Sequence, residues 1–326
     1  VKGHYLSSRL HNPKSNFLKK VTYTLFNRPD IKLVLDRMKN KKSRTRIERE
    51  LKSAFKGTPF SGKVHFVEHH LSHMASTHLV SPFEDSVSVS VDGFGDFSSA
   101  AWGACYGEKI EVDQRVFFPH SLGVFYQALT QFIGFPHYGD EYKVMGLAPY
   151  GKPTYLRKLR EVVRIKNDGT FDLNLDFFLH HNNKIEYKWS GGSPYVGNLF
   201  NAQAMEELFG FSFRKKGDEL KKYHFDIAHS VQAMYEEAFF NILEASFEKY
   251  SLDQLTLAGG CAMNSVANGK IYRRSPFKKV YIQSAAGDAG GAIGAAFNVS
   301  NKLDEIRNPF YMSHAYWGPS YNNEYI

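Results

Sequence analysis

The sequence predicts an α/β fold with a mainly parallel sheet, because short apolar strands alternate with helices in the last third of the chain. A buried strand at 255–258 precedes a helix that opens at Asn264, and a strand at 279–283 precedes a helix at 289–297. Upstream, serine and valine alternate strictly at 86–91, which is the period of a strand. The 326 residues, 43% of them hydrophobic, suffice for a large core and for two lobes.

Residues 1–63 form a strongly basic arm. They carry 17 lysines and arginines against 4 acidic residues, a net charge of +13, whereas the rest of the chain carries −5. Helical spacing at 30–38 and 45–55 predicts a mostly helical arm, solvated beside the acidic body. A polyanion, an acidic glycan or a membrane surface is the alternative partner for this charge. No nucleic-acid recognition motif accompanies the arm, so a nucleic-acid partner is not expected.

Residues 64–222 are expected to form a first lobe that contains an insertion. In order, the expected elements are a strand at 63–67, a helix from about 70 to before 81, strands at 86–91 and 99–106 around a turn at 92–96, helices at 120–135 and 155–163, and a strand at 170–175. The region 164–222 has the short strands and glycine turns of an insertion or lid. The strand–turn–strand at 86–106 also occurs in folds that bring backbone N–H groups to phosphates.

Residues 223–317 are expected to form a second lobe. Asp226 is predicted to cap a long helix that runs to about residue 250. The strands at 86–92 and 255–258 are expected to lie in different lobes and to end at the cleft between them. Residues 318–326 would begin a linker to a further domain.

Two histidines and one distant aspartate predict a metal site. His69 and His73 are four residues apart, so on a helix their imidazoles project from one face. Asp288 lies in a turn of small residues, where its carboxylate can approach an ion without crowding. Two imidazoles and one carboxylate leave coordination positions open, as a catalytic metal requires. The set therefore favours a metal-assisted transferase, with iron(II), zinc or manganese as the ion.

Several segments in a fixed order resemble a known family. They are HHLSHMAS at 69–76, SVSVDGFGD at 88–96, PHSLGVFYQALTQFIGF at 119–135, GDEYKVMGLAPYGKP at 139–153, and AGGCAMNSVANGKI at 258–271 followed by IQSAAGDAGGAIGAAF at 282–297. Together, over roughly residues 64–319, they resemble the nodulation-protein-U and cephem-hydroxymethyl O-carbamoyltransferases. The universal tRNA threonylcarbamoyl-transferase is a more distant likeness.

The resemblance implies a two-lobed actin-like fold of the ribonuclease H-like class, whose usual N-terminal strands are not found in this sequence. It also implies an enzyme that makes carbamoyl-adenylate from carbamoyl phosphate and ATP. A YrdC-like domain, also absent here, forms the adenylate, and the actin-like part transfers the carbamoyl group with a bound metal, iron(II) in the best-known case. The acceptor is a hydroxyl of a sugar, a glycolipid or a natural product.

The resemblance also assigns roles to individual residues. His69, His73 and Asp288 would hold the metal; Asp92, Gly93 and Gly95 would form the phosphate-side turn; Glu141, Lys143, Gly146 and Gly151 would line the nucleotide cleft; and Gly259, Gly260 and Asn264 would face adenosine. Lys143 can neutralise the phosphate that leaves with AMP. His70 and His137 are the candidate bases for the acceptor proton.

Other functions remain open at this stage. The basic arm favours threonylcarbamoyl transfer to tRNA, whereas residues 139–151 follow the small-molecule family. A non-catalytic nucleotide-binding scaffold is the alternative from another class, and a sugar kinase is disfavoured by the histidine pair. The two cysteines form no disulfide framework and no apolar span of about 18 residues occurs, so a cytoplasmic protein without a membrane span is expected. Without its first strands the lobe would expose a sheet edge, so self-association is expected.

Overall fold

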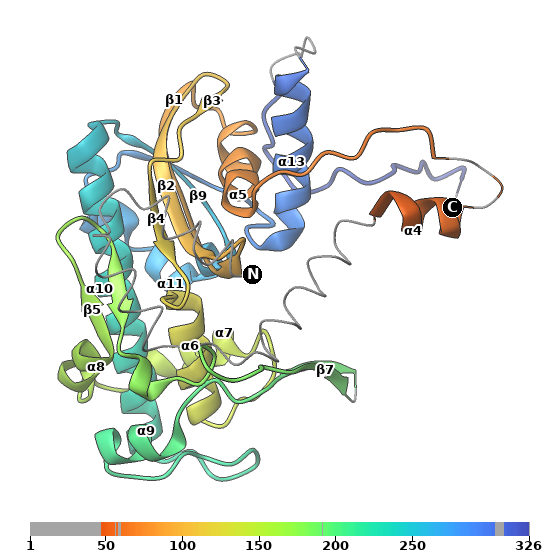
Figure 1. Ribbon diagram of the computed structural model, residues 1–326. Coiled ribbons are helices and arrows are strands. Elements are labelled where there is room, and N and C mark those ends of the chain that lie inside the picture. The colour runs from red at the N-terminus through yellow and green to blue at the C-terminus, as the bar shows by residue number, and fades with distance from the viewer. Residues whose placement is uncertain (1–46, 56, 58–59, 191, 304–309, 326) are drawn as a thin grey trace, which may run out of the picture.

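The chain folds around a mixed six-stranded sheet with helices on both faces (Figure 1). The computed structural model describes residues 47–55, 57, 60–190, 192–303 and 310–325. The path through the sheet is β10-β9-β1-β2-β3, with β4 also paired to β2. The strands are β1 Asp85–Gly95, β2 Ser98–Tyr106, β3 Lys109–Ile110, β4 Gln114–Phe117, β9 Gln254–Ala258 and β10 Lys279–Ile282. The pairs β1–β9 and β9–β10 are parallel, whereas β2 pairs antiparallel with β1, β3 and β4. The expected α/β class is therefore confirmed, but the expectation of a mainly parallel sheet is wrong, because the hairpin partners of β1 make the sheet mixed.

The alternation in β1 separates two chemically different faces. Val87, Val89 and Val91 point into the main apolar core, where α6 and α10 pack. The serines point to the other face, where Ser86 Oγ lies 2.8 Å from Nδ1 of His78 and Ser90 Oγ lies 2.9 Å from Nδ1 of His70. Both faces of this central strand are therefore buried, the polar one by hydrogen bonding to histidines of α5.

Four helices make the main layers. Helix α6 spans Leu122–Phe132 and α10 spans Lys222–Tyr250, both against the valine face of β1. Helix α5, His69–His78, covers the serine face, and α13, Asp288–Lys302, packs along α5 (Figure 1). A Cβ on Gly294 would lie 1.8 Å from the carbonyl oxygen of Ser72, so the backbones of α13 and α5 are in direct contact there.

Shorter elements surround this core. They are α4 Ile47–Ala54, α7 Glu141–Leu147, α8 Leu156–Val162, α9 Ala202–Phe209, α11 Ser265–Asn268 and α12 Ile271–Arg274, with hairpins β5 Val163–Ile165 with β6 Phe171–Leu173 and β7 Tyr187–Ser190 with β8 Ser193–Val196. Both hairpins lie in the region expected to be an insertion. None of the helices in the described part of the chain is long and apolar enough to cross a membrane.

Three further sequence-based expectations are wrong. The segment 63–67 forms no strand, because it runs beside α13 and pairs with no strand of the sheet. Asp226 does not cap α10, which begins one turn earlier; its carboxylate instead accepts the Lys152 N–H at 2.9 Å and pairs with Lys222 at 2.8 Å. The strands at 86–92 and 255–258 do not lie in different lobes, because β1 and β9 are hydrogen-bonded neighbours.

The basic arm is described only in part. The helix expected at 30–38 lies outside the described residues. The helix expected at 45–55 corresponds to α4, none of whose residues is buried. The proposed packing of the arm against the acidic body therefore stays a prediction.

Candidate metal centre and adjoining cavity

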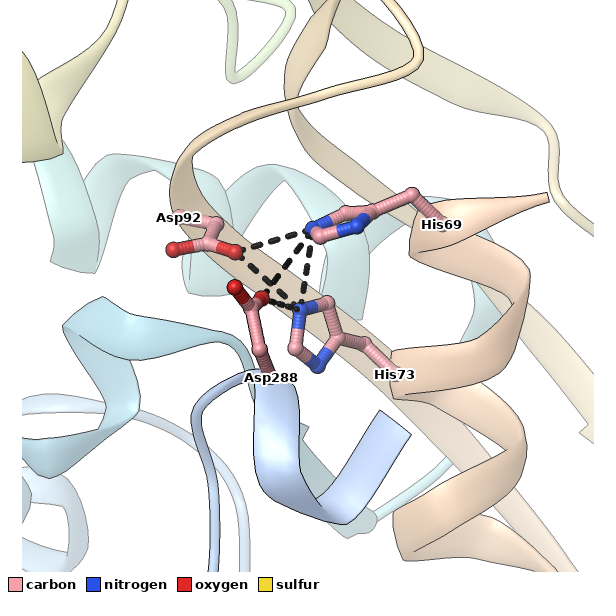
Figure 2. Close-up of side chains that lie close together, drawn as sticks. All are labelled: His69, His73, Asp92 and Asp288. Atoms are coloured by element: carbon pink, nitrogen blue, oxygen red, sulfur yellow. Dashed lines mark hydrogen bonds and ion pairs between the residues drawn. The ribbon is translucent and has the colours of Figure 1, made fainter. Parts of the chain in front are cut away.

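Four side chains converge where β1 ends and where α5 and α13 begin (Figure 2). The Nε2 atoms of His69 and His73 lie 3.1 Å apart, and Oδ2 of Asp92 lies 3.0 Å from the first and 3.1 Å from the second. Oδ1 of Asp288 lies 3.7 Å and 3.6 Å from the same two nitrogens. One donor atom from each residue thus falls within 4.8 Å of every other. The structure brings together the three predicted ligands and adds Asp92.

The donor set fits one divalent transition-metal ion. Ligands at about 2.1 Å from a shared ion lie about 3.0 Å apart at right angles and about 3.4 Å apart in a tetrahedron. The separations among His69, His73 and Asp92, 3.0–3.1 Å, fall in this range, and Asp288 lies slightly farther from the two nitrogens, at 3.7 and 3.6 Å. A mixed nitrogen and oxygen set suits iron(II), zinc or manganese, whereas calcium prefers a cage of oxygens.

The N-terminus of α5 fixes the two histidines. The Glu68 carboxylate accepts the N–H groups of His70 and Leu71, which caps the helix, and it forms a two-bonded pair with Arg115 at 3.0 Å. The His69 ring lies against Gly95, where a Cβ would be 1.9 Å from the ring. Gly95, which the resemblance assigned to a phosphate turn, therefore gives the imidazole its space.

Asp92 is held by the junction between β1 and β9. Its Oδ1 accepts the N–H groups of Gly93 at 2.7 Å and Gly260 at 3.2 Å, and this leaves Oδ2 for the two histidines. A Cβ on Gly260 would lie 2.8 Å from this Oδ1, so the glycine permits the approach. The sequence interpretation gave Asp92 only a phosphate-side role. The missed signal was its position at the carboxyl end of a central strand, where ligands of α/β sheets gather.

The cluster is electrostatically coupled. Burial would raise the pKa of Asp92, but hydrogen bonds from His69 and His73 outweigh burial and hold that pKa well below its usual range. The His73 hydrogen bond lowers the pKa of Asp288. Burial would lower the pKa of His73, yet the two aspartates raise it to about 9. Without a metal, His73 therefore carries a proton at neutral pH, at the position that a cation would take.

A cavity of about 320 Å³ opens beside the cluster and shares Asp92 with it. Five residues assigned by the resemblance line it, namely Asp92, Gly93, Glu141, Gly260 and Asn264. Burial raises the pKa of Glu141. The Asn264 amide is already bonded, because its oxygen caps α11 at the Ala267 N–H and its nitrogen donates to Gln232. Asn264 would therefore contact a bound molecule mainly by van der Waals packing, because its amide groups already form hydrogen bonds within the protein.

Other assigned glycines lie away from the cavity wall. Gly259 has a φ of +89°, and its Cβ would be 2.3 Å from the carbonyl oxygen of Val91, so the strand end requires glycine. Gly151 packs its Cα side against the Phe225 carbonyl of α10, where a Cβ would lie 2.0 Å away. Gly146 faces open space. The first two glycines thus have packing roles, and nucleotide contacts for all three remain predictions.

Three predicted catalytic side chains do not line this cavity. His70 is fully buried behind the cluster, bonded to Ser90. Lys143 pairs with Asp140 at 2.6 Å and faces a second cavity, which His137 also lines. Sequence alone could not place Lys143, because Glu141 and Lys143, two positions apart on α7, face different cavities.

Tyr138 was missed by the sequence interpretation. It lines the cavity and is 59% exposed at its rim. Burial and the nearby charges of Asp288 and Asp92 raise the pKa of its hydroxyl, so this ring lies close to the cluster. The available signal was an exposed aromatic residue directly before the glycine–acid segment.

Comparison with known proteins gives a consistent result over most of the chain. A family model described as carbamoyltransferase N-terminus matches residues 4–297. The uncharacterized protein sll1178 of Synechocystis is 37% identical over 266 residues, which cover 80% of this chain and 41% of that protein. Nodulation protein NolNO of Sinorhizobium fredii is 34% identical over 265 residues, 80% of this chain and 35% of that protein.

The chain spans about two fifths of the length of these relatives. Among solved structures, HypF of T. kodakarensis aligns with a TM-score of 0.38 and 14% identity, over 80% of this chain and 39% of that one. This structural likeness is too low to bear on fold or function.

Proposed function

Because this chain belongs to the carbamoyltransferase family, we propose that it is the transfer part of an O-carbamoyltransferase. It would move a carbamoyl group from carbamoyl-adenylate, made from carbamoyl phosphate and ATP, to a hydroxyl of a sugar, a glycolipid or a natural product. The observation that carries the proposal is a metal-type donor cluster that opens on a ligand-sized cavity and shares Asp92 with it. An actin-like arrangement of the complete fold is part of the same proposal.

His69, His73, Asp92 and Asp288 would hold the divalent ion, iron(II) by preference. The bound ion would polarise the carbamoyl oxygen as a Lewis acid. The two imidazoles must be neutral to serve as ligands, so His73 would give up its proton on binding the ion. The Gly260 N–H keeps the Asp92 carboxylate turned toward the histidines during this exchange.

The cavity gives the adenylate an orientation. With adenosine toward Gly260 and Asn264, the carbamoyl end would point to Asp92 and the cluster. The acceptor hydroxyl must lose a proton, and we assign Glu141 as the base. It lines the same cavity, and burial raises its pKa, which makes its carboxylate a stronger base. His70 and His137 are less suited, because the first is fully buried and the second lines another cavity.

Single-turnover transfer from carbamoyl-adenylate tests this function, with the adenylate supplied by a separate YrdC-like domain. His73→Ala and Asp92→Asn should lose metal and transfer while they keep nucleotide binding. Glu141→Gln should keep the metal and lose transfer, and Lys278→Ala, on the exposed surface, is the control. Full transfer by metal-free His73→Ala would refute the mechanism. Nucleotide binding without transfer, in a metal-loaded wild-type chain given the adenylate and an acceptor, would favour the non-catalytic scaffold.

A further inference from the structure

A second cavity, of about 360 Å³, lies on the other side of the segment that begins α7. Its walls come from residues 134–143 and from the basic loop 214–220. Along the shared segment, Tyr138 and Glu141 face the first cavity, whereas His137 and Lys143 face the second. Residues 137–143 thus contribute to the walls of both spaces.

The second cavity contains a buried guanidinium, that of Arg214. Arg214 is only 8% exposed. Its Nε donates to the Ile133 carbonyl at 2.7 Å and its Nη1 to the Asp218 carbonyl at 2.5 Å, while the group lies 5.0 Å from the Phe135 ring centre. Within the described parts of the chain, it forms no ion pair with a carboxylate. The carbonyl oxygens that accept its hydrogen bonds are neutral, so they do not compensate the positive charge of the buried guanidinium. Such a charge attracts an anion.

Two lysines add to this charge. The Lys143 ammonium lies 5.2 Å from the centre of the same Phe135 ring, and Lys216 donates to Nε2 of His137 at 3.1 Å. Asp140 and Asp218 are the acidic residues among the lining, so the cations outnumber the carboxylates by three to two. The positive field extends behind the cavity: burial first, and then the charges of Arg214 and Lys221, lower the pKa of His224 to about 4.

We propose that this cavity binds the phosphoryl group of a small molecule, with Lys143, Lys216 and Arg214 around the phosphate. Lysine ammonium groups bind phosphate as point charges. Two-bonded recognition of a carboxylate by Arg214 is disfavoured, because carbonyl oxygens already occupy its Nε and Nη1. Phe135, Pro136 and Leu220 supply an apolar wall for an attached organic group, and the volume matches that of small-molecule sites. The proposal does not depend on carbamoyl transfer.

Calorimetric titration of the full chain, in metal-free buffer without a carbamoyl donor, tests this site. The probes are inorganic phosphate and glucose 6-phosphate, with glucose as the uncharged control. Each phosphate probe should bind the wild type. Lys216→Ala should weaken binding about tenfold or more, since a charged hydrogen bond is lost, and Lys216→Arg should keep most of it. Lys278→Ala, a fully separate surface lysine, should have no effect.

The two probes identify the source of the phosphoryl group. If glucose 6-phosphate binds more tightly than inorganic phosphate, the sugar contacts the apolar wall and the ligand is an organic phosphate. If the two bind equally, free phosphate is the ligand. Unchanged phosphate affinity in both Lys216→Ala and the Lys143→Ala, Lys216→Ala double variant would overturn the assignment, as would absence of binding at millimolar phosphate. Should the double variant fail to fold by circular dichroism, the exposed Lys216→Ala substitution alone decides.

Discussion

Replacing Gly95 with alanine is a direct test of how the metal centre is built. The resemblance assigned this glycine to a phosphate turn, but its hydrogen atoms face the His69 ring. A Cβ at this position would lie 1.9 Å from Cγ, 2.0 Å from Cδ2 and 2.4 Å from Nδ1 of His69. Because ordinary contact begins at 3.4 Å, the ring must move by about 1.5 Å.

Moving the His69 ring by this distance should lower the affinity of the site for a metal ion. Nε2 of His69 lies 3.0 Å from Asp92 and 3.1 Å from Nε2 of His73, so a shift of this size removes it from the shared centre. The remaining three donors would still bind, but disturbance of a ligand's support typically costs about 10–100-fold in metal affinity. We expect a loss at the upper end of this range for Gly95→Ala.

The assay is a competition titration with zinc or manganese and a chromogenic chelator. Gly93→Ala is the matched control, because this glycine lies on the same strand and its Cβ would have no atom within 4 Å. Circular dichroism would establish that both variants are folded. Wild-type metal affinity in Gly95→Ala would refute the geometry, and an equal loss in Gly93→Ala would show that the effect is not steric.

Three further predictions follow from the same structure. Gly294→Ala should destabilise the fold by about 1–3 kcal/mol in urea unfolding, since its Cβ would lie 1.8 Å from an α5 carbonyl, whereas Gly291→Ala, with a nearest contact of 4.0 Å, should be neutral or slightly stabilising. Metal affinity should rise with pH by about tenfold per unit between pH 6.5 and 8.5, because His73, with a pKa of about 9, must lose its proton to bind; a flat profile would contradict this. Leu129→Ala, at a fully buried position, should lower the free energy of unfolding by about 2–5 kcal/mol. Ile47→Ala, on exposed α4, should lower it by less than about 0.5 kcal/mol. Equal losses in urea unfolding would contradict the assigned core.

Elements with a strong local period could be predicted from the sequence. The strand at 86–91 and the helices at 120–135 and 155–163 correspond to β1, α6 and α8. The expectations that were wrong concerned features that depend on contacts between residues far apart in the sequence. The pairing of β1 with β9 is a tertiary choice between segments that lie far apart in the chain, and the helix start at Lys222 lacks a standard capping residue.

In the site too, locally encoded features could be predicted and those that depend on tertiary contacts could not. The i, i+4 spacing of His69 and His73 placed both on one helical face without knowledge of the fold. Asp92 joins them because Gly260, in the turn that follows β9, donates its N–H to one carboxylate oxygen and leaves the other for the histidines. Lys143 and Glu141 differ by two positions on a short helix and therefore face different cavities, a distinction that needs the direction of α7.

The metal centre combines side chains that lie far apart in the sequence, which has a consequence for its assembly during biosynthesis. His69, His73 and Asp92 leave the ribosome together, whereas Gly260, whose N–H holds Asp92 in place, follows 168 residues after Asp92. Asp288 follows about 200 residues after Asp92. At bacterial and eukaryotic elongation rates this interval lasts roughly 10–40 seconds. A nascent chain can thus present two histidines and one carboxylate well before the fourth donor exists. Stable capture of the ion would mark the moment at which the C-terminal third has docked onto β1.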